Sequence, residues 1–240
     1  AHPYGSSVEE THIKDISVHD MVNYFQSIFK VHEIYVVGNL NQSEVSLLVN
    51  AFNLLPISKD NTSSIINSTK GSARQHVEKK NSVQSSIRLG KKSLPKSNST
   101  YFDLQILNHL LGGFFGSRLM KNIREEKGLT YGIYSSINAF QNESLLTIGA
   151  DVDKSNLTLA IQEIKNELKK LRTEEIEPQE LTLAKNHFIG SLQSDMANPF
   201  SVAEKVKNIQ IFNLPKNFYQ NLIDRVDQIA SSEIKQAAES

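Results

Sequence analysis

One stretch, residues 101–113 (YFDLQILNHLLGG), is apolar almost all round and constrains the fold more than any other feature of the chain. A helix without a polar face must be covered on every side, so this helix should lie at the centre of a packed core. The two runs that follow it, residues 131–139 and 144–152, instead suit half-buried strands. In the second run, apolar residues alternate at Leu146, Ile148, Ala150 and Val152. A buried helix beside half-buried strands predicts a sheet with helices packed on one face.

Local signals place the remaining elements. Ser17 has the setting of a helix cap, Asn41 can cap a second helix, and Pro178 suits the first turn of a later one. Residues 32–38 (HEIYVVG) are rich in β-branched side chains, and residues 83–90 (VQSSIRLG) alternate, so both segments predict strands.

The order of these elements predicts an α+β fold with a mostly antiparallel sheet covered on one face by helices. A long amphipathic helix should follow a cap near Asp153 or Ser155, and only helices should come after it. We expect a single domain over residues 17–240, preceded by an extended lead-in at residues 1–16. The chain starts at Ala1 without Met, which suggests a processed or truncated product.

Charge and hydrophobicity argue against a nucleic-acid partner and a membrane span. The 26 basic and 26 acidic residues cancel, so no net charge draws the chain to nucleic acid or to anionic lipid. Residues 57–100 carry nine Lys or Arg against two acidic residues, but Asn and Ser lie between them rather than aromatic residues, which favours a solvated face. No apolar run approaches the roughly 20 residues that cross a bilayer. We therefore expect neither a nucleic-acid partner nor a membrane span.

Histidine spacing does not predict a metal site in this chain. A helical zinc motif needs two His on one face with a Glu between them, as in H-x-x-E-H. Among the seven His residues, His32 is followed by Glu33, but position 36 is Val and the run suits a strand. There are no cysteines, which removes thiolate ligands as well. We expect no complete zinc site within these residues.

A cation and a phenol bracket one turn in residues 123–136 (IREEKGLTYGIYSS). Arg124 falls on the last turn of a short helix, a glycine stop follows, and Tyr131 begins a strand seven positions later. In one interpretation both residues are structural, with Arg at a helix end and Tyr filling a strand position. In the other, both face a groove, where they hold a peptide carbonyl or stabilise an oxyanion that forms on it. The residues alone leave both interpretations open.

The glycine-rich string LGGFFGSRL at residues 111–119 lacks the Lys-Ser/Thr ending of a phosphate-binding loop. It predicts a turn between two helices, in which Gly112 and Gly113 allow left-handed backbone angles.

Several strings together resemble one family, the pitrilysin/insulinase group of zinc peptidases, which includes the mitochondrial processing peptidases. The strings are HPYG near the start, VVGNLNQSEV, LLGGFFGSRLMKNIREEKGLTYGIYSSINAF, and EIEPQELTLAKNHFIGSL. The resemblance extends over residues 2–235. The block from LGGFFGSRL to LTYG carries it most specifically, because loop, helix, stop and strand all match in order.

The resemblance implies that this chain is the zinc-less half of a two-half peptidase. Zinc and a general-base Glu are expected in the partner half, which is either fused to this chain through residues 1–16 or a separate subunit. Arg124 and Tyr131 fall on the two positions at which such a half contributes to a chamber that holds an extended peptide. Gly112, Gly113 and Gly116 resemble a glycine turn that touches the substrate. This chain alone is then expected to be inactive and to bind no cofactor.

The alternative is a non-catalytic structural or assembly subunit, because this fold also serves as architecture in a respiratory complex. The presence of both Arg124 and Tyr131 favours the peptidase half, since a scaffold does not need the pair.

Overall fold

The structure is a computed structural model that describes residues 8–27, 33–55 and 74–239. The chain divides into two compact units, Ala1–Glu78 and Lys79–Ser240, and each is described by itself. The string HPYG and residues His2 and His32 lie outside the described residues. The boundary that we expect between residues 16 and 17 stays a prediction.

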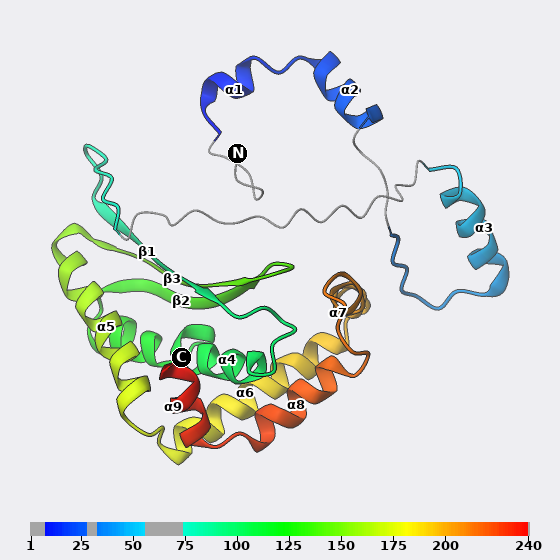
Figure 1. The fold of residues 1–240 in the computed structure, drawn as a ribbon. Coiled ribbons are helices and arrows are strands. Elements are labelled where there is room, and N and C mark those ends of the chain that lie inside the picture. The colour runs from blue at the N-terminus through cyan, green and yellow to red at the C-terminus, as the bar shows by residue number, and fades with distance from the viewer. Residues whose placement is uncertain (1–7, 28–32, 56–73, 240) are drawn as a thin grey trace. The chain divides into compact units, whose positions relative to one another are not determined.

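The described residues of the first unit form three helices, α1 (Glu10–Lys14), α2 (Val18–Ser27) and α3 (Gln42–Phe52) (Figure 1). Helix α1 lies in the segment that we expected to be extended. The predicted caps are confirmed. The Asp20 carboxylate accepts the backbone N–H of Ser17 at 2.9 Å, while the side chain of Asn41 accepts the N–H groups of Ser43 and Glu44 at the start of α3.

The strand predicted at residues 32–38 is wrong for the part that the structure describes, because residues 33–40 have no strand assignment. A β-branched run becomes a strand only when its backbone pairs with another strand. Among the described residues of this unit there is no strand to supply that pairing. The run therefore has a local preference for extended backbone, but no pairing strand among the described residues of this unit.

The second unit contains a three-stranded antiparallel sheet made of β1 (Gln84–Ser93), β2 (Thr130–Ala139) and β3 (Ser144–Asp153). The strand order is β1-β3-β2, so β3 lies in the middle (Figure 1). Ile87, Ile133 and Ile148 are buried on the face that packs against the helices. Val83, the first residue of the strand predicted at residues 83–90, is exposed and lies just before β1. The predicted α+β class and antiparallel sheet are confirmed.

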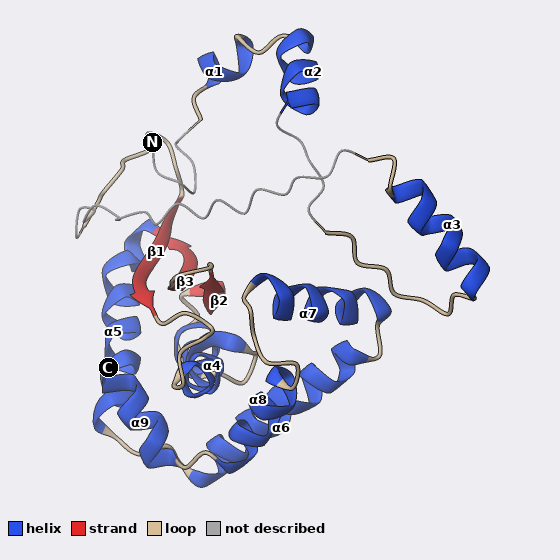
Figure 2. Cartoon of the chain, turned by 45° about the vertical axis from the view of Figure 1, so that its right-hand side comes forward, coloured by secondary structure: helices blue, strands red, loops and turns tan. Residues whose placement is uncertain are grey.

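The helices of this unit gather on one face of the sheet (Figure 2). The apolar run is helix α4 (Tyr101–Asn108) continued by a π-helical turn, η1 (His109–Gly113), and it buries Ile106, Leu110 and Leu111 as predicted. The remaining elements are η2 (Met120–Glu126), η3 (Lys154–Asn156), α5 (Leu157–Thr173), α6 (Pro178–Met196), α7 (Pro199–Ile211), α8 (Phe218–Gln228) and α9 (Ser231–Glu239). Asp153 caps η3, the short helix directly before α5, and Pro178 lies in the first turn of α6 as predicted.

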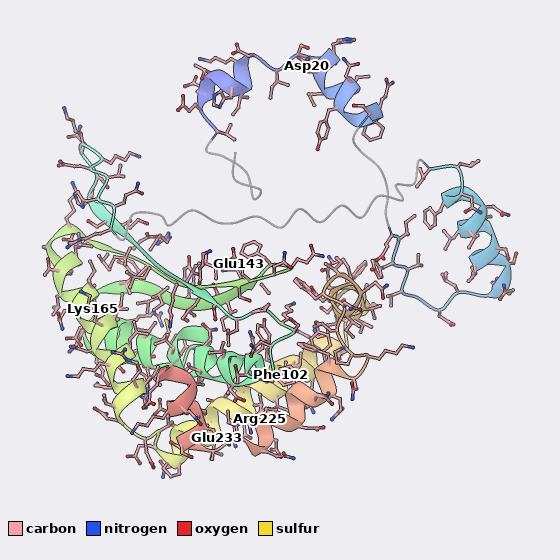
Figure 3. All side chains as sticks on the ribbon, viewed as in Figure 1. Asp20, Phe102, Glu143, Lys165, Arg225 and Glu233 are labelled. Carbon is pink, nitrogen blue, oxygen red and sulfur yellow. The ribbon has the colours of Figure 1, made fainter. Side chains whose placement is uncertain are left out.

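One arginine joins three helices in this layer. Arg225 of α8 donates two hydrogen bonds to the Asp103 carboxylate on α4, at 2.6 and 3.0 Å, and one to Glu233 on α9, at 3.0 Å (Figure 3). The paired geometry suits a guanidinium, whose planar donors match a carboxylate. Ile234 of α9 is fully buried beside this cluster of contacts. The C-terminal helices are therefore part of the core that supports α4.

Candidate functional site

The turn from η2 into β2 has the form that its sequence predicts. Helix η2 ends at Glu126, and Gly128 follows with a φ angle of +61°, a conformation that favours glycine. The backbone N–H of Leu129 donates to the carbonyl of Ile123 at 2.9 Å and closes the turn. The glycine stop between a helix and a strand is confirmed, and it places Arg124 and Tyr131 on the two arms of one turn.

A β-bulge turns Tyr131 outward. Thr130 lies opposite Val152, whereas Ile133 lies opposite Ala150, so Tyr131 and Gly132 together face the single residue Asp151. In an unbroken strand, Tyr131 would lie on the same face as Ile133, which is only 3% exposed. With the extra residue, Tyr131 is 93% exposed instead. Bulges of this kind re-aim side chains and recur beside active sites.

Tyr131 lines a surface groove at the end of the sheet where β1 and β2 begin and β3 ends. The groove has a volume of about 650 Å³, and its walls include Gln84, Thr130, Asp151 and Asp153. These side chains bring groups that can exchange hydrogen bonds with a peptide backbone into a lining that also includes Val83 and Leu129. Arg124 is not among the residues that line this groove.

Arg124 contacts an aromatic ring from the neighbouring turn. Its guanidinium carbon lies 4.7 Å from the centre of the Phe115 ring, which is 60% exposed. A cation over an aromatic face is attracted to it, and this favours the observed direction of an otherwise flexible side chain. Arg124 and Phe115 therefore present a cationic and apolar surface that joins the glycine turn to the end of η2.

Helix η2 is fixed to α5 by a buried amide. The side-chain nitrogen of Asn122 donates to Glu167 at 2.7 Å and to Glu163 at 3.1 Å. Ile123 beside it is fully buried. Because the residue before Arg124 cannot move without breaking core packing, the backbone under Arg124 is held rigidly.

The glycine turn is confirmed as a connection between two helices, but its glycines do not use the left-handed angles that they allow. Gly112 has a φ of −160°, and neither Gly112 nor Gly113 lies in the left-handed region. Close approach explains Gly112 instead, because a Cβ there would lie 2.7 Å from the backbone nitrogen of Ser135 on β2. Gly112 is buried, whereas Gly113 is exposed. Contact of Gly112, Gly113 and Gly116 with a substrate stays a prediction.

The sequence did not predict the histidine pair beneath this turn. The Nε2 atom of His109 lies 3.1 Å from the Nδ1 atom of His187 on α6, and the ring of His109 stacks on Phe114 with centroids 4.7 Å apart. Phe114 also lies 4.7 Å from the His187 ring, so three rings pack together. The two histidines are separated by 78 positions, and no local spacing could have indicated their contact.

Burial and, to a lesser extent, His187 lower the pKa of His109 to about 4. An unfolded His titrates near 6.5, so between these values the unfolded chain binds a proton that the folded chain does not. Stability should therefore fall as the pH decreases below 6.5. From pH 7 to pH 5, we expect this residue to remove about 2 kcal/mol from the free energy of unfolding.

Urea denaturation at both pH values checks this expectation. The control is His109→Gln, which keeps a donor near Nε2 but cannot titrate. Its free energy of unfolding should fall by about 2 kcal/mol less than that of the wild type between pH 7 and pH 5. An equal pH dependence in both proteins would show that His109 does not titrate in this range.

The described residues contain no group of three or more His, Asp or Glu side chains that could hold a metal ion. The donor set of this part of the chain therefore does not fit the catalytic zinc of a peptidase, which takes three protein ligands. No helix among the described residues is both long enough and apolar enough to cross a membrane.

Comparison with known proteins places the chain in a family. A family model described as the peptidase M16 inactive domain matches residues 16–188. An uncharacterized zinc protease of Bacillus subtilis, YmxG, is 34% identical over 116 residues, which cover 48% of this chain and 28% of that protein. The non-peptidase homolog YmxG of Helicobacter pylori is 27% identical and covers 92% of this chain and 52% of its own length.

The fold is similar to that of a solved peptidase M16 inactive domain from Pseudomonas fluorescens. The two are 20% identical with a TM-score of 0.77, over 95% of this chain and 55% of the other. The chain spans about half or less of the curated relatives quoted above. The match over residues 16–188 confirms the resemblance found in the sequence, and the chain belongs to the family of peptidase M16 inactive domains.

Proposed function

We propose that this chain is the non-metal half of a zinc metalloendopeptidase and helps to enclose an extended peptide substrate. The observation that carries the proposal is the outward orientation of Tyr131, which is almost fully exposed at the edge of a groove. An aromatic residue that packs against nothing does not stabilise the core, and a bulge interrupts the strand where it turns outward. Binding of a peptide would give the exposed Tyr131 side chain and the bulge a function.

In this proposal the phenol and the guanidinium have different tasks. Tyr131 donates a hydrogen bond to the oxygen of the scissile carbonyl as negative charge develops on it. Arg124, held over Phe115, binds backbone carbonyls of the peptide and keeps it in place beside the groove. Gly113 is exposed on the glycine turn, and peptide backbone passes close to it in this proposal. A zinc-binding half, fused or separate, supplies the metal, for which the described part of this chain has no fitting donor set.

Metal analysis and a cleavage assay test whether zinc and catalysis require the zinc-binding half. The purified chain should contain less than one zinc per molecule and should not cleave a fluorogenic peptide, whereas the mixture with the zinc-binding half should cleave it. Stoichiometric tightly bound zinc in the chain alone would contradict the proposal, because it would require a ligand set within this half.

A second candidate is a non-catalytic assembly subunit, which the name of the Helicobacter pylori relative, a non-peptidase homolog, favours. The sequence of the complete protein or of its partner decides between them. A peptidase should contain H-x-x-E-H followed by a distant Glu, because these residues bind zinc and activate water. A complete protein and partner without this string would favour the assembly subunit.

A further inference from the structure

The bulge that turns Tyr131 outward is held by one hydroxyl group. Oγ1 of Thr130 donates to the carbonyl oxygen of Asp151 at 2.7 Å, with the carbonyl of Gly132 as a second acceptor at 3.0 Å. The same oxygen accepts the backbone N–H of Gly132 at 3.2 Å. A hydroxyl can donate and accept at once, so Thr130 connects the bulged strand to the strand opposite it.

These bonds replace the ladder pairing that the bulge removes. Tyr131 and Gly132 share one partner position on β3, so their backbone groups cannot both pair in the regular pattern. Unpaired backbone groups cost free energy, which would favour a slip to the regular register. In that register Tyr131 would point toward the helices rather than into the groove. The Thr130 hydroxyl opposes this slip by satisfying the Gly132 N–H and the Asp151 carbonyl.

We propose that Thr130 is a positioning residue, whose hydroxyl holds the bulge and thereby keeps the Tyr131 phenol at the groove. The functional part rests on the proposed role of Tyr131, while the structural part stands without it. Threonine is suited to this position because its β-branched side chain fits a strand and its hydroxyl reaches the backbone two residues ahead.

Amide hydrogen exchange in this chain tests the structural part. Thr130→Val keeps the shape of the side chain and removes its hydroxyl, so the Gly132 amide should exchange about fivefold faster. Thr130→Ser keeps the hydroxyl, so the Gly132 amide should exchange as slowly as in the wild type. The control is Thr147→Val, the same change in the same sheet, at a hydroxyl that contacts Ser136 at 2.8 Å. Unchanged Gly132 exchange in Thr130→Val would overturn the proposal.

Turnover in the complete protein, assembled with its zinc-binding half, tests the functional part. Thr130→Val should lower kcat about fivefold with little change in KM, and Thr130→Ser should retain the wild-type value. In the Tyr131→Phe background, Thr130→Val should have no further effect, because it acts through the phenol. If Thr130→Val lowers kcat by the same factor in the Tyr131→Phe background as in the wild type, the positioning role is overturned.

The two readouts separate the possible failures. Suppose that Tyr131→Phe lowers turnover. If Thr130→Val then speeds Gly132 exchange but leaves turnover unchanged, the positioning role of Thr130 is overturned. If Tyr131→Phe is as active as the wild type, the proposed function of Tyr131 fails, while faster exchange would still support the hold on the bulge.

Discussion

Replacing Tyr131 with Phe should lower the turnover of the assembled peptidase by at least roughly tenfold, since removal of one oxyanion donor typically costs about 10²–10³-fold. The phenol is the group that the bulge brings to the groove, and it would bond more strongly to the transition state than to the ground-state carbonyl. Most of the loss should therefore appear in kcat, with KM nearly unchanged. Steady-state cleavage of a fluorogenic peptide measures both constants.

Tyr134→Phe is the matched control, because it removes the same hydroxyl from the same strand. Tyr134 is 49% exposed, and its ring lies across Gly149 of β3, where an added Cβ would be 2.5 Å from the phenol oxygen. It is therefore packed on the sheet rather than turned into the groove. Wild-type turnover in Tyr131→Phe would assign that residue to packing, and equal losses in both variants would indicate a general effect on the sheet.

Gly112→Ala should cost about 3 kcal/mol of stability, near the upper end for an overpacked core. The new Cβ would lie 2.7 Å from both the Cβ and the backbone nitrogen of Ser135, and 3.0 Å from a methyl group of Leu119. Neither backbone can move away easily, because η1 and β2 are both packed in the core. The chain has no Trp, so urea denaturation followed by far-UV circular dichroism is the suitable measurement.

Gly190→Ala provides a control of opposite sign. Gly190 lies inside α6, and a Cβ there meets nothing within 4 Å. Because Ala is the better helix former, this change should stabilise the chain by about 1 kcal/mol or less. A small effect of Gly112→Ala would mean that η1 and β2 separate more easily than their close approach indicates.

The sequence predicted those parts of the fold that depend on short-range signals. Asn41, Asp153 and Pro178 begin helices where expected, and Gly128 ends one, because caps and glycine stops act over a few residues. The two paired strands after the buried helix were also predicted, since they are adjacent in the chain and a short turn joins them.

The features that the sequence did not predict depend on contacts between distant residues. The contact of His109 with His187 and the approach of Gly112 to Ser135 arise from packing that no spacing encodes. The bulge after Thr130 had one local signal, a glycine inside a strand, which often marks such an irregularity. Arg124 and Tyr131 were identified as a pair, but their surroundings at Phe115 and at the groove required the structure.

The contacts of Arg225 show which C-terminal residues the folded core needs. This one side chain links α8 to both α4 and α9, and Ile234 completes the packing from the last helix. The family match ends at residue 188, yet the interior continues to residue 234. A fragment trimmed to residues 16–188 would lose the support of the central helix, so the folded core extends beyond the residues that the family model matches.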